Sequence, residues 1–321
     1  MIQLKCLPSP FILSLMCLCL FGCSEPETPE PVKAPTEPVL TAAPVEGESF
    51  FLSATLDMLW CKPGTFQMGS PEDEKNHGMR ETQHEVTLTQ GFWLGKYEVT
   101  QAQWLKVMGG HSGPNPNPSR FKGATLPLEY VSWNEVMKFC QKLTQNEKAA
   151  GRLPEGWAYT LPTEAQWEYA CRAGTTTATA FGDSLSSKQA NFDGNAPYGG
   201  ASKGPLLKRT TEVGSYPANA WGFHDMHGNV SEWCHDWYGD CPSGSTSDPV
   251  GPSIDPRVAR GGTWATKDAS VTIPTYRRVY RGGSWGYHGH VMRSAGRSKY
   301  PPHYRRDNLG FRLSLQTEKT E

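Results

Sequence analysis

The pattern of apolar and polar positions predicts three helices, and each begins at a capping box. In a capping box, a Ser or Thr side chain caps the first turn, and a Glu or Gln three residues later reaches back. In the second helix, Val136, Phe139 and Leu143 recur at the spacing of one buried stripe. Gly174 ends the third helix. The capping pairs are Thr100 with Gln103, Ser132 with Glu135, and Thr163 with Gln166.

Strand signals are fewer and shorter. They fall at residues 64–69, 85–88 and 92–94. Beyond Gly174 helical periodicity almost disappears, and Gly, Asn, Asp, Pro, Tyr and Trp dominate. Such long irregular stretches need partners for their backbone polar groups, and bound metal ions are one economical source. The pattern therefore predicts short helices among strands and long loops.

Composition narrows the classes of protein. The chain has 321 residues, which fits one or two domains. Its 31 Lys and Arg against 32 Asp and Glu give a net charge of -1, which argues against a nucleic-acid partner. The 33 Gly and 26 Pro exclude a coiled coil or a helical bundle, since both residues break helices.

The N-terminus has the features of an export signal. Lys5 precedes an apolar run that is too short to span a membrane as a helix. The run ends in Leu-Phe-Gly-Cys, which resembles the lipobox of bacterial lipoproteins and implies cleavage of residues 1–22 and lipidation of Cys23. An ordinary cleaved signal is the alternative. The resemblance implies anchoring in a bacterial cell envelope, at the outer membrane in a Gram-negative cell because Ser24 follows.

Residues 23–49 follow as a tether. They are rich in Pro, Glu, Thr and Ala and contain no aromatic residue, so they cannot bury enough apolar surface to fold. We expect this segment to hold a folded domain away from the membrane.

Five cysteines remain after Cys23. An envelope location permits disulfides, and Cys234 and Cys241 are close enough in sequence for a small bridged loop. The odd count leaves at least one free thiol. Cys140 and Cys171 fall on apolar helix faces and are predicted to be buried, reduced thiols. The remaining cysteine is Cys61.

One short internal repeat is visible. Residues 257–264 and 278–285 share the pattern Arg-Val-x-Arg-Gly-Gly-Ser/Thr-Trp. Two copies are too few for a solenoid, so we expect two related strands in one sheet.

The motifs, taken in order, resemble the formylglycine-generating enzyme, or sulfatase-modifying factor, family. They comprise Met-Gly at 68–69, Glu-Val-Thr-Leu at 85–88, Tyr-Glu-Val-Thr at 97–100, the segments 127–133 and 161–170, Gly-Asn-Val-Ser-Glu-Trp at 228–233, Arg-Gly-Gly-Ser-Trp at 281–285 and Leu-Gly-Phe-Arg at 309–312. The resemblance implies one α+β domain over residues 50–316, related to the C-type lectin fold, loop-rich, with short helices and small antiparallel sheets. A tail of residues 317–321 follows.

The family includes a copper oxidase that converts a sulfatase cysteine to formylglycine. The resemblance implies that this oxidase binds copper through two cysteines between the Gly-Gly-Ser motif and the final Gly-Phe-Arg. Here no cysteine follows Cys241, and copper(I) prefers thiolate ligands. We therefore expect no copper and a domain that binds a protein, peptide or glycan. The alternatives are an oxidase with unusual ligands and a structural component of a secretion or motility apparatus.

The resemblance also implies bound calcium. One site would use the Glu232 carboxylate with backbone carbonyls, because calcium takes six to eight oxygen ligands. Asp225 stands where the family has Asn. A second site would use Asn191 and Phe192, with Asp193 as a candidate acid. The first set is Asp225, Gly228, Val230 and Glu232.

A groove near the C-terminal motifs is the predicted binding surface, because exposed aromatic and basic side chains suit peptides and sugars. His288 and His290 lie two residues apart and could share a metal, but a polar lining role is the preferred interpretation. Arg281 and Arg312 are predicted to be structural. Tyr300 and His303 are further exposed candidates. The groove residues are Trp285, Tyr287, His288, His290, Arg293 and Arg297.

Overall fold

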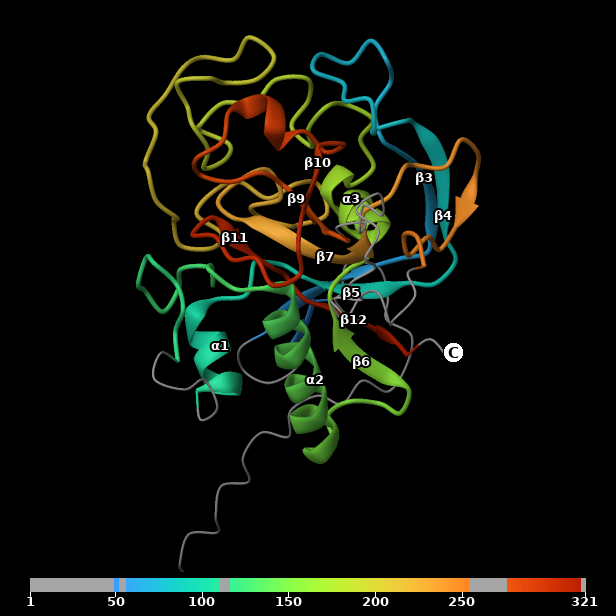
Figure 1. The fold of residues 1–321 in the computed structure, drawn as a ribbon, viewed down its shortest axis with the longest axis vertical. Helices are drawn as coiled ribbons and strands as arrows, with labels where there is room; N and C mark the ends of the chain where they lie inside the picture. Colours follow the sequence, from blue (N-terminus) through green and yellow to red (C-terminus); the bar gives the residue numbers. More distant parts are fainter. Residues whose placement is uncertain (1–48, 52–55, 110–115, 254–275, 319–321) are drawn as a thin grey trace, which may run out of the picture. The chain divides into compact units, whose positions relative to one another are not determined.

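The computed structural model describes residues 49–51, 56–109, 116–253 and 276–318 (Figure 1). The export signal, Cys23, nearly all of the tether and the first copy of the internal repeat lie outside these residues. No helix in the described part of the chain is long and apolar enough to cross a membrane.

All three predicted helices are present. They are α1 (Gln101–Met108), α2 (Trp133–Ala149) and α3 (Glu164–Arg172), and each begins at its predicted capping box, with both reciprocal hydrogen bonds formed. Helix α3 ends at Arg172, one residue before its C-cap Ala173, which adopts the left-handed conformation with φ of 48° and precedes the predicted stop Gly174. After α3, the only further helix in the described residues is the short 3₁₀ helix η1 (Gly289–Met292). Local sequence signals therefore determine where the helices begin.

The largest sheet has five antiparallel strands in the order β1-β2-β5-β12-β6. The C-terminal strand β12 lies between β5 and β6, so the end of the domain is built into its centre (Figure 1). Helix α2 contacts β6 and α1. The strands are β1 (Ser49–Phe51), β2 (Asp57–Cys61), β5 (Phe92–Gly95), β6 (Trp157–Thr160) and β12 (Ser314–Thr317).

Two smaller sheets carry the remaining motifs. Their orders are β10-β9-β7-β11 and β3-β4-β8, and the pairs β7–β11 and β4–β8 are parallel. The expected small antiparallel sheets are thus found, with one short parallel pair added to each. The strands are β7 (Ser231–Trp237), β9 (Arg278–Arg281), β10 (Arg297–Tyr300), β11 (Leu309–Gly310), β3 (Gly64–Met68), β4 (His84–Leu88) and β8 (Thr246–Ser247).

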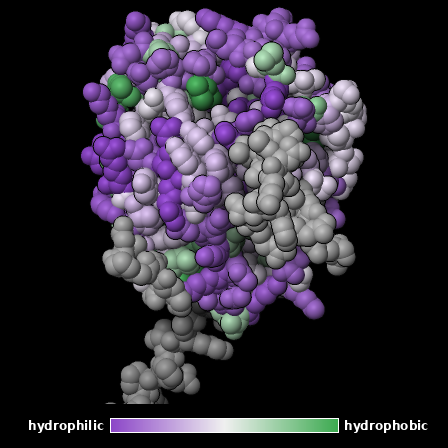
Figure 2. Space-filling model, in the orientation of Figure 1, coloured by the Kyte–Doolittle hydropathy of each residue, from purple (hydrophilic) through white to green (hydrophobic). Residues whose placement is uncertain are grey.

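The core is built around large aromatic side chains. Trp93, Trp167 and Trp233 are at most 1% exposed, and each removes a large apolar area from water. Cys140 and Cys171 are buried free thiols, as predicted. In contrast, the surface seen in Figure 2 is mainly hydrophilic, with small, separate apolar patches.

Side chains form hydrogen bonds with backbone polar groups of the long irregular segment between α3 and β7. Asn219 accepts hydrogen bonds from the backbone N–H groups of Trp221 and Phe223 and donates to the carbonyl of Ala170. The Asn229 side chain accepts from the N–H of Thr211 at 2.9 Å. Amide side chains therefore pair with some of the backbone groups for which metal ions were suggested as partners.

Candidate functional site

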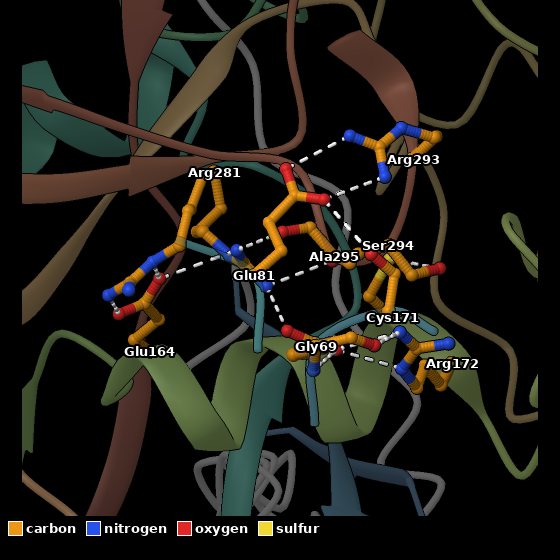
Figure 3. Close-up of polar contacts among 12 residues, drawn as sticks. Gly69, Glu81, Glu164, Cys171, Arg172, Arg281, Arg293, Ser294 and Ala295 are labelled. Carbon is orange, nitrogen blue, oxygen red and sulfur yellow. Dashed lines mark hydrogen bonds and ion pairs between the residues drawn. The ribbon is translucent and has the colours of Figure 1, made fainter. Parts of the chain in front are cut away.

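A buried network of arginine and glutamate side chains lies beneath the C-terminal motifs (Figure 3). Glu164 and Glu168 project from one side of α3 because they are about one helical turn apart. Arg281, at the end of β9, contacts both, with Nη1 3.3 Å from Glu164 and Nη2 donating to Glu168. It also donates to the carbonyls of Ser294 and Ala295, at 2.9 and 3.0 Å. The structural role predicted for Arg281 is therefore confirmed.

Arg293 and Arg297 belong to the same network, although the sequence placed them in an open groove. Arg293 is 4% exposed and donates two hydrogen bonds to Glu81, at 2.8 and 2.9 Å, and one to Glu74 at 2.7 Å. Arg297 donates to Glu164 at 2.8 Å. Burying an arginine is costly unless its charge is paired, and both charges are paired here. Neither guanidinium is a free cation for a ligand.

Two glycines bring the motif strand close to the helices. Gly282 and Gly283 have φ of 88° and 68°, a region that favours glycine. A Cβ on Gly283 would lie 2.0 Å from Met292 Cε. Both glycines line a cavity of about 160 Å³ whose walls also include His290, Arg293 and Arg297. Of the six predicted groove residues, these three line the cavity.

Cys171 is a buried cysteine that contacts the segment around Arg293. Its Sγ lies 3.8 Å from Ser294 Oγ and 3.8 Å from His227 Nε2. His227 bonds the carbonyl of Met292 through Nδ1, and its Nε2 accepts from the N–H of Ala180, so the ring is neutral. Burial raises the pKa of Cys171 to about 12 and lowers the pKa of His227 to about 4. This pair is not a thiolate–imidazolium couple.

Cys234 and Cys241 are both free, so the bridge considered from the sequence is not formed. Cys234 is fully buried, whereas Cys241 is half-buried with Sγ 3.0 Å from Arg297 Nη1. Their short separation in sequence does not bring the thiols together.

A second surface combines tyrosines with an arginine that sequence reasoning missed. The rings of Tyr280, Tyr300 and Tyr304 stack in a row, with centroids 4.8 and 4.3 Å apart. Arg306 Nη1 donates to the hydroxyls of Tyr300 at 2.8 Å and Tyr287 at 3.3 Å. We call Tyr287, Tyr300, Tyr304 and Arg306 the tyrosine–arginine surface. Among the described residues, the groups that act on the charge of Arg306 are the tyrosines and not a carboxylate, so this charge is available to a ligand.

Hydrogen bonds link the hydroxyl group of Tyr300 to Tyr280 and Arg306. Burial raises the pKa of Tyr300, but hydrogen bonds from Tyr280 and Arg306 outweigh burial, so the pKa lies below its ordinary value. An arginine beside stacked phenol rings suits a ligand that carries a carboxylate and an apolar or aromatic group. No spacing signal marked Arg306, because it follows an exposed Tyr-Arg pair in a loop.

The other predicted groove residues lie at the edge of this region. Trp285 is half-buried, with its indole N–H donating to the carbonyl of Asp307 at 3.1 Å. His288 has a side chain 60% exposed and lies 3.7 Å from Asp193. The rings of His288 and His290 are 6.0 Å apart. His303 is exposed, as expected.

The principal residue of the predicted calcium site has another partner. Glu232 is 1% exposed, and Arg312 donates to both of its oxygens, at 2.6 and 2.7 Å. The indole N–H of Trp167 adds a third hydrogen bond at 2.8 Å. Arg312 is therefore structural, as predicted, and it already neutralises the Glu232 carboxylate.

Two other predicted calcium ligands do keep an unpartnered oxygen. Asp225 accepts from the N–H of Gly214 through Oδ2, but its buried Oδ1 has no partner, and the same holds for Asn191 Oδ1. The two segments meet where the carbonyl of Asn191 accepts from the N–H of Asn229. Phe192 is buried, and Gly228 and Val230 lie in the same loop. The oxygens of Asp225 and Asn191 fit a hard cation, whereas Glu232 does not fit while it is paired.

Among the described residues, no group of three or more His, Cys, Asp and Glu side chains could hold a metal ion. This finding does not test a site built largely from backbone carbonyls. Calcium therefore stays a prediction, with Asp225 and Asn191 as its best-supported side-chain ligands.

Comparison with known proteins gives a consistent result. The family described as "Sulfatase-modifying factor enzyme 1-like domain" matches residues 51–317. The chaperone protein LppX of Paenibacillus barcinonensis is 33% identical over 225 residues, 59% of this chain and 75% of that protein. The formylglycine-generating enzyme of Streptomyces coelicolor is 31% identical over 240 residues, 71% of this chain and 62% of that enzyme. The mouse enzyme of the same name is 29% identical over 222 residues, 66% of this chain and half of that enzyme.

Two solved structures share the architecture over their whole length. PvdO from Pseudomonas aeruginosa has a TM-score of 0.63 and 27% identity, covering 85% of this chain and 100% of that one. Treponema denticola variable protein 1 has a TM-score of 0.62 and 25% identity, covering 85% of this chain and 99% of that one.

Proposed function

This chain belongs to the family of sulfatase-modifying factor enzyme 1-like domains, and we propose that it is a ligand-binding envelope lipoprotein rather than a copper oxidase. The predicted α+β fold, that of the formylglycine-generating enzyme and related to C-type lectins, is confirmed. The proposal concerns what the domain does with that fold.

The observation that carries the proposal is the chemistry of the segment after the Gly-Gly-Ser motif. Residues 285–297 contain two histidines and one methionine but no cysteine. Met292 is buried, and it packs where a Cβ on Gly283 would stand. Copper(I) prefers thiolates, and a thiolate site can also exchange with the thiol of a cysteine substrate. Histidine and methionine provide neither a thiolate ligand nor a site that exchanges with a substrate thiol.

The tyrosine–arginine surface is the proposed binding site, and an acidic segment of a polypeptide is the proposed ligand. Arg306 offers a charge-assisted hydrogen bond to a carboxylate, and the stacked rings of Tyr300 and Tyr304 offer a flat apolar contact. The Paenibacillus relative is named a chaperone protein, and a chaperone binds other polypeptides. That name supports a polypeptide over a glycan.

The envelope location rests on the sequence. Lipidation of Cys23 would anchor the chain, because several acyl chains on one residue give stable membrane attachment. Residues 23–49 would then extend the domain from the membrane toward its ligand.

The oxidase is the second candidate, because the mouse and Streptomyces relatives are named formylglycine-generating enzymes. It requires a copper site built from ligands other than a cysteine pair after the Gly-Gly-Ser motif.

Binding at the tyrosine–arginine surface is tested with short fluorescein-labelled peptides of acidic, neutral and basic composition. We expect fluorescence polarisation to rise with acidic peptides, and Arg306→Ala to weaken that binding at least about tenfold, since hydrogen bonds to charged groups contribute about 1.5–3 kcal/mol. The matched control is Arg305→Ala, because Arg305 is the neighbouring arginine but pairs with Glu135. Equal effects of the two substitutions, or no preference for acidic peptides, would contradict the proposal.

A further inference from the structure

A second cavity, of about 360 Å³, lies on a different part of the domain. It is bounded by the edge strand β3, by the C-terminal end of α3 and by Trp221. It shares no lining residue with the cavity below the C-terminal motifs. Its lining includes Glu85 and Tyr169 from the family motifs but no residue of the tyrosine–arginine surface.

Three aromatic rings form its apolar side. Trp221 meets Tyr169 edge to face, with centroids 4.8 Å apart and planes at 74°. Phe66 lies 5.2 Å from Tyr169 with planes at 49°. Tyr169 is 6% exposed and forms the floor, whereas Phe66 and Trp221 are only partly buried. Partly exposed rings at an angle to each other leave a face free for a flat, weakly polar ligand.

Uncharged hydrogen-bonding groups dominate the rim. Thr65 and Gln67 are exposed on β3, and Glu85 stands directly opposite Gln67 on β4. Thr175 and Thr176, just after α3, complete the rim. Hydroxyl, amide and carboxylate groups accept and donate the hydrogen bonds that vicinal sugar hydroxyls require.

The charges of the cavity exclude an anionic ligand. Arg172 lines it, but its guanidinium donates to Glu168 at 2.9 Å and to the carbonyl of Gly69 at 2.6 Å. Arg172 is therefore held by buried partners, and the other charged group in the lining is the exposed carboxylate of Glu85. An acidic ligand would meet this carboxylate at the rim, which disfavours its binding.

An added β-strand is also disfavoured. Gly69, just beyond the end of β3, donates its N–H to Glu168 and accepts from Arg172, so its backbone groups are occupied. Pro63, just before β3, has no N–H. The open edge is thus limited to the five residues of β3 itself.

We propose that this cavity binds a neutral saccharide, with a sugar ring against Trp221 and Phe66 and its hydroxyls bonded to Gln67 and Glu85. The site is independent of the tyrosine–arginine surface, and it would give an envelope protein a glycan site in addition to its peptide site.

The test uses isothermal titration of the purified full chain with three neutral disaccharides, N,N′-diacetylchitobiose, cellobiose and maltose. Choline and glucuronate serve as cationic and anionic contrasts. We expect at least one disaccharide to bind and glucuronate not to bind. Trp221→Ala should weaken binding about tenfold or more, which corresponds to about 1.4 kcal/mol, because it removes the ring against which the sugar would lie.

Two further variants keep the test decisive. Gln67→Ala removes an exposed rim group without touching the core, and it should weaken binding with an unchanged melting temperature. Leu207→Ala is the control, since Leu207 is 41% exposed and lies outside the cavity lining. Failure of all three disaccharides to bind, binding of choline alone, or equal affinity in Trp221→Ala and Leu207→Ala would overturn the proposal. Arg306→Ala should leave saccharide binding unchanged, which separates this site from the proposed peptide surface.

Discussion

Replacing Arg281 by Met tests how strongly the buried network holds the C-terminal motifs in place. Arg281 is 1% exposed and pairs with Glu164 and Glu168, both also buried. Breaking a buried pair by removing one partner costs about 3–5 kcal/mol, because an uncompensated charge stays buried. The matched control is Arg305→Met. Arg305 also pairs with a glutamate, Glu135, but its side chain is 46% exposed, so its loss should cost less than about 1 kcal/mol.

The assay is equilibrium unfolding in urea for the wild type and both variants. We expect Arg281→Met to lower the free energy of unfolding by several times more than Arg305→Met. A double-mutant cycle with Glu168→Gln isolates the pair, and we expect a coupling energy in the range of about 0.5–3 kcal/mol. Similar losses in the two arginine variants, or no coupling with Glu168, would refute the reasoning.

Three further outcomes are expected. Burial raises the pKa of Asp236 from 3.8 to about 7, so its contribution to the free energy of unfolding is lost as pH rises through that range, by up to about 4 kcal/mol. Between pH 4 and 8, the free energy of unfolding of Asp236→Asn should therefore fall less than that of the wild type. Parallel pH profiles of the two proteins would contradict this. Ser132→Ala, which removes the α2 cap, should cost about 1 kcal/mol in thermal or urea unfolding. Chelation should lower the melting temperature and Ca²⁺ should restore it, less so in Asp225→Ala, whereas an unchanged melting temperature would remove the calcium prediction.

The helices could be predicted because their signals are local. The cap residues Thr100, Ser132 and Thr163 bond to groups three residues away, so the sequence alone contains the interaction. Strand signals at β3 and β4 and the repeat copy that contains β9 were also local, and strands are found there. How the strands pair was harder to predict. Arg278 of β9 is buried because its guanidinium lies between two rings, 3.7 Å from Trp133 and 3.5 Å from Trp237, and these partners are distant in sequence.

The same reason explains why Arg293 was misplaced. Arg293 was expected to line an open groove, but its partner Glu81 is 212 residues away along the chain. Calcium binding by Glu232 stays a prediction, and no sequence signal indicated that Arg312 from the C-terminal motif pairs with its carboxylate. Motif spacing identifies the residues that matter, whereas pairing across the fold decides which of them stay free for a ligand.

The central claim is that this family member binds a ligand and does not oxidise a cysteine. The most direct measurement incubates the purified full chain, copper and oxygen with a peptide containing Cys-x-Pro-x-Arg, and detects aldehyde by mass spectrometry and hydrazide capture. The Streptomyces coelicolor enzyme serves as the positive control. We predict no aldehyde above a blank of copper and peptide alone. Aldehyde that forms only when both this protein and copper are present would contradict the account.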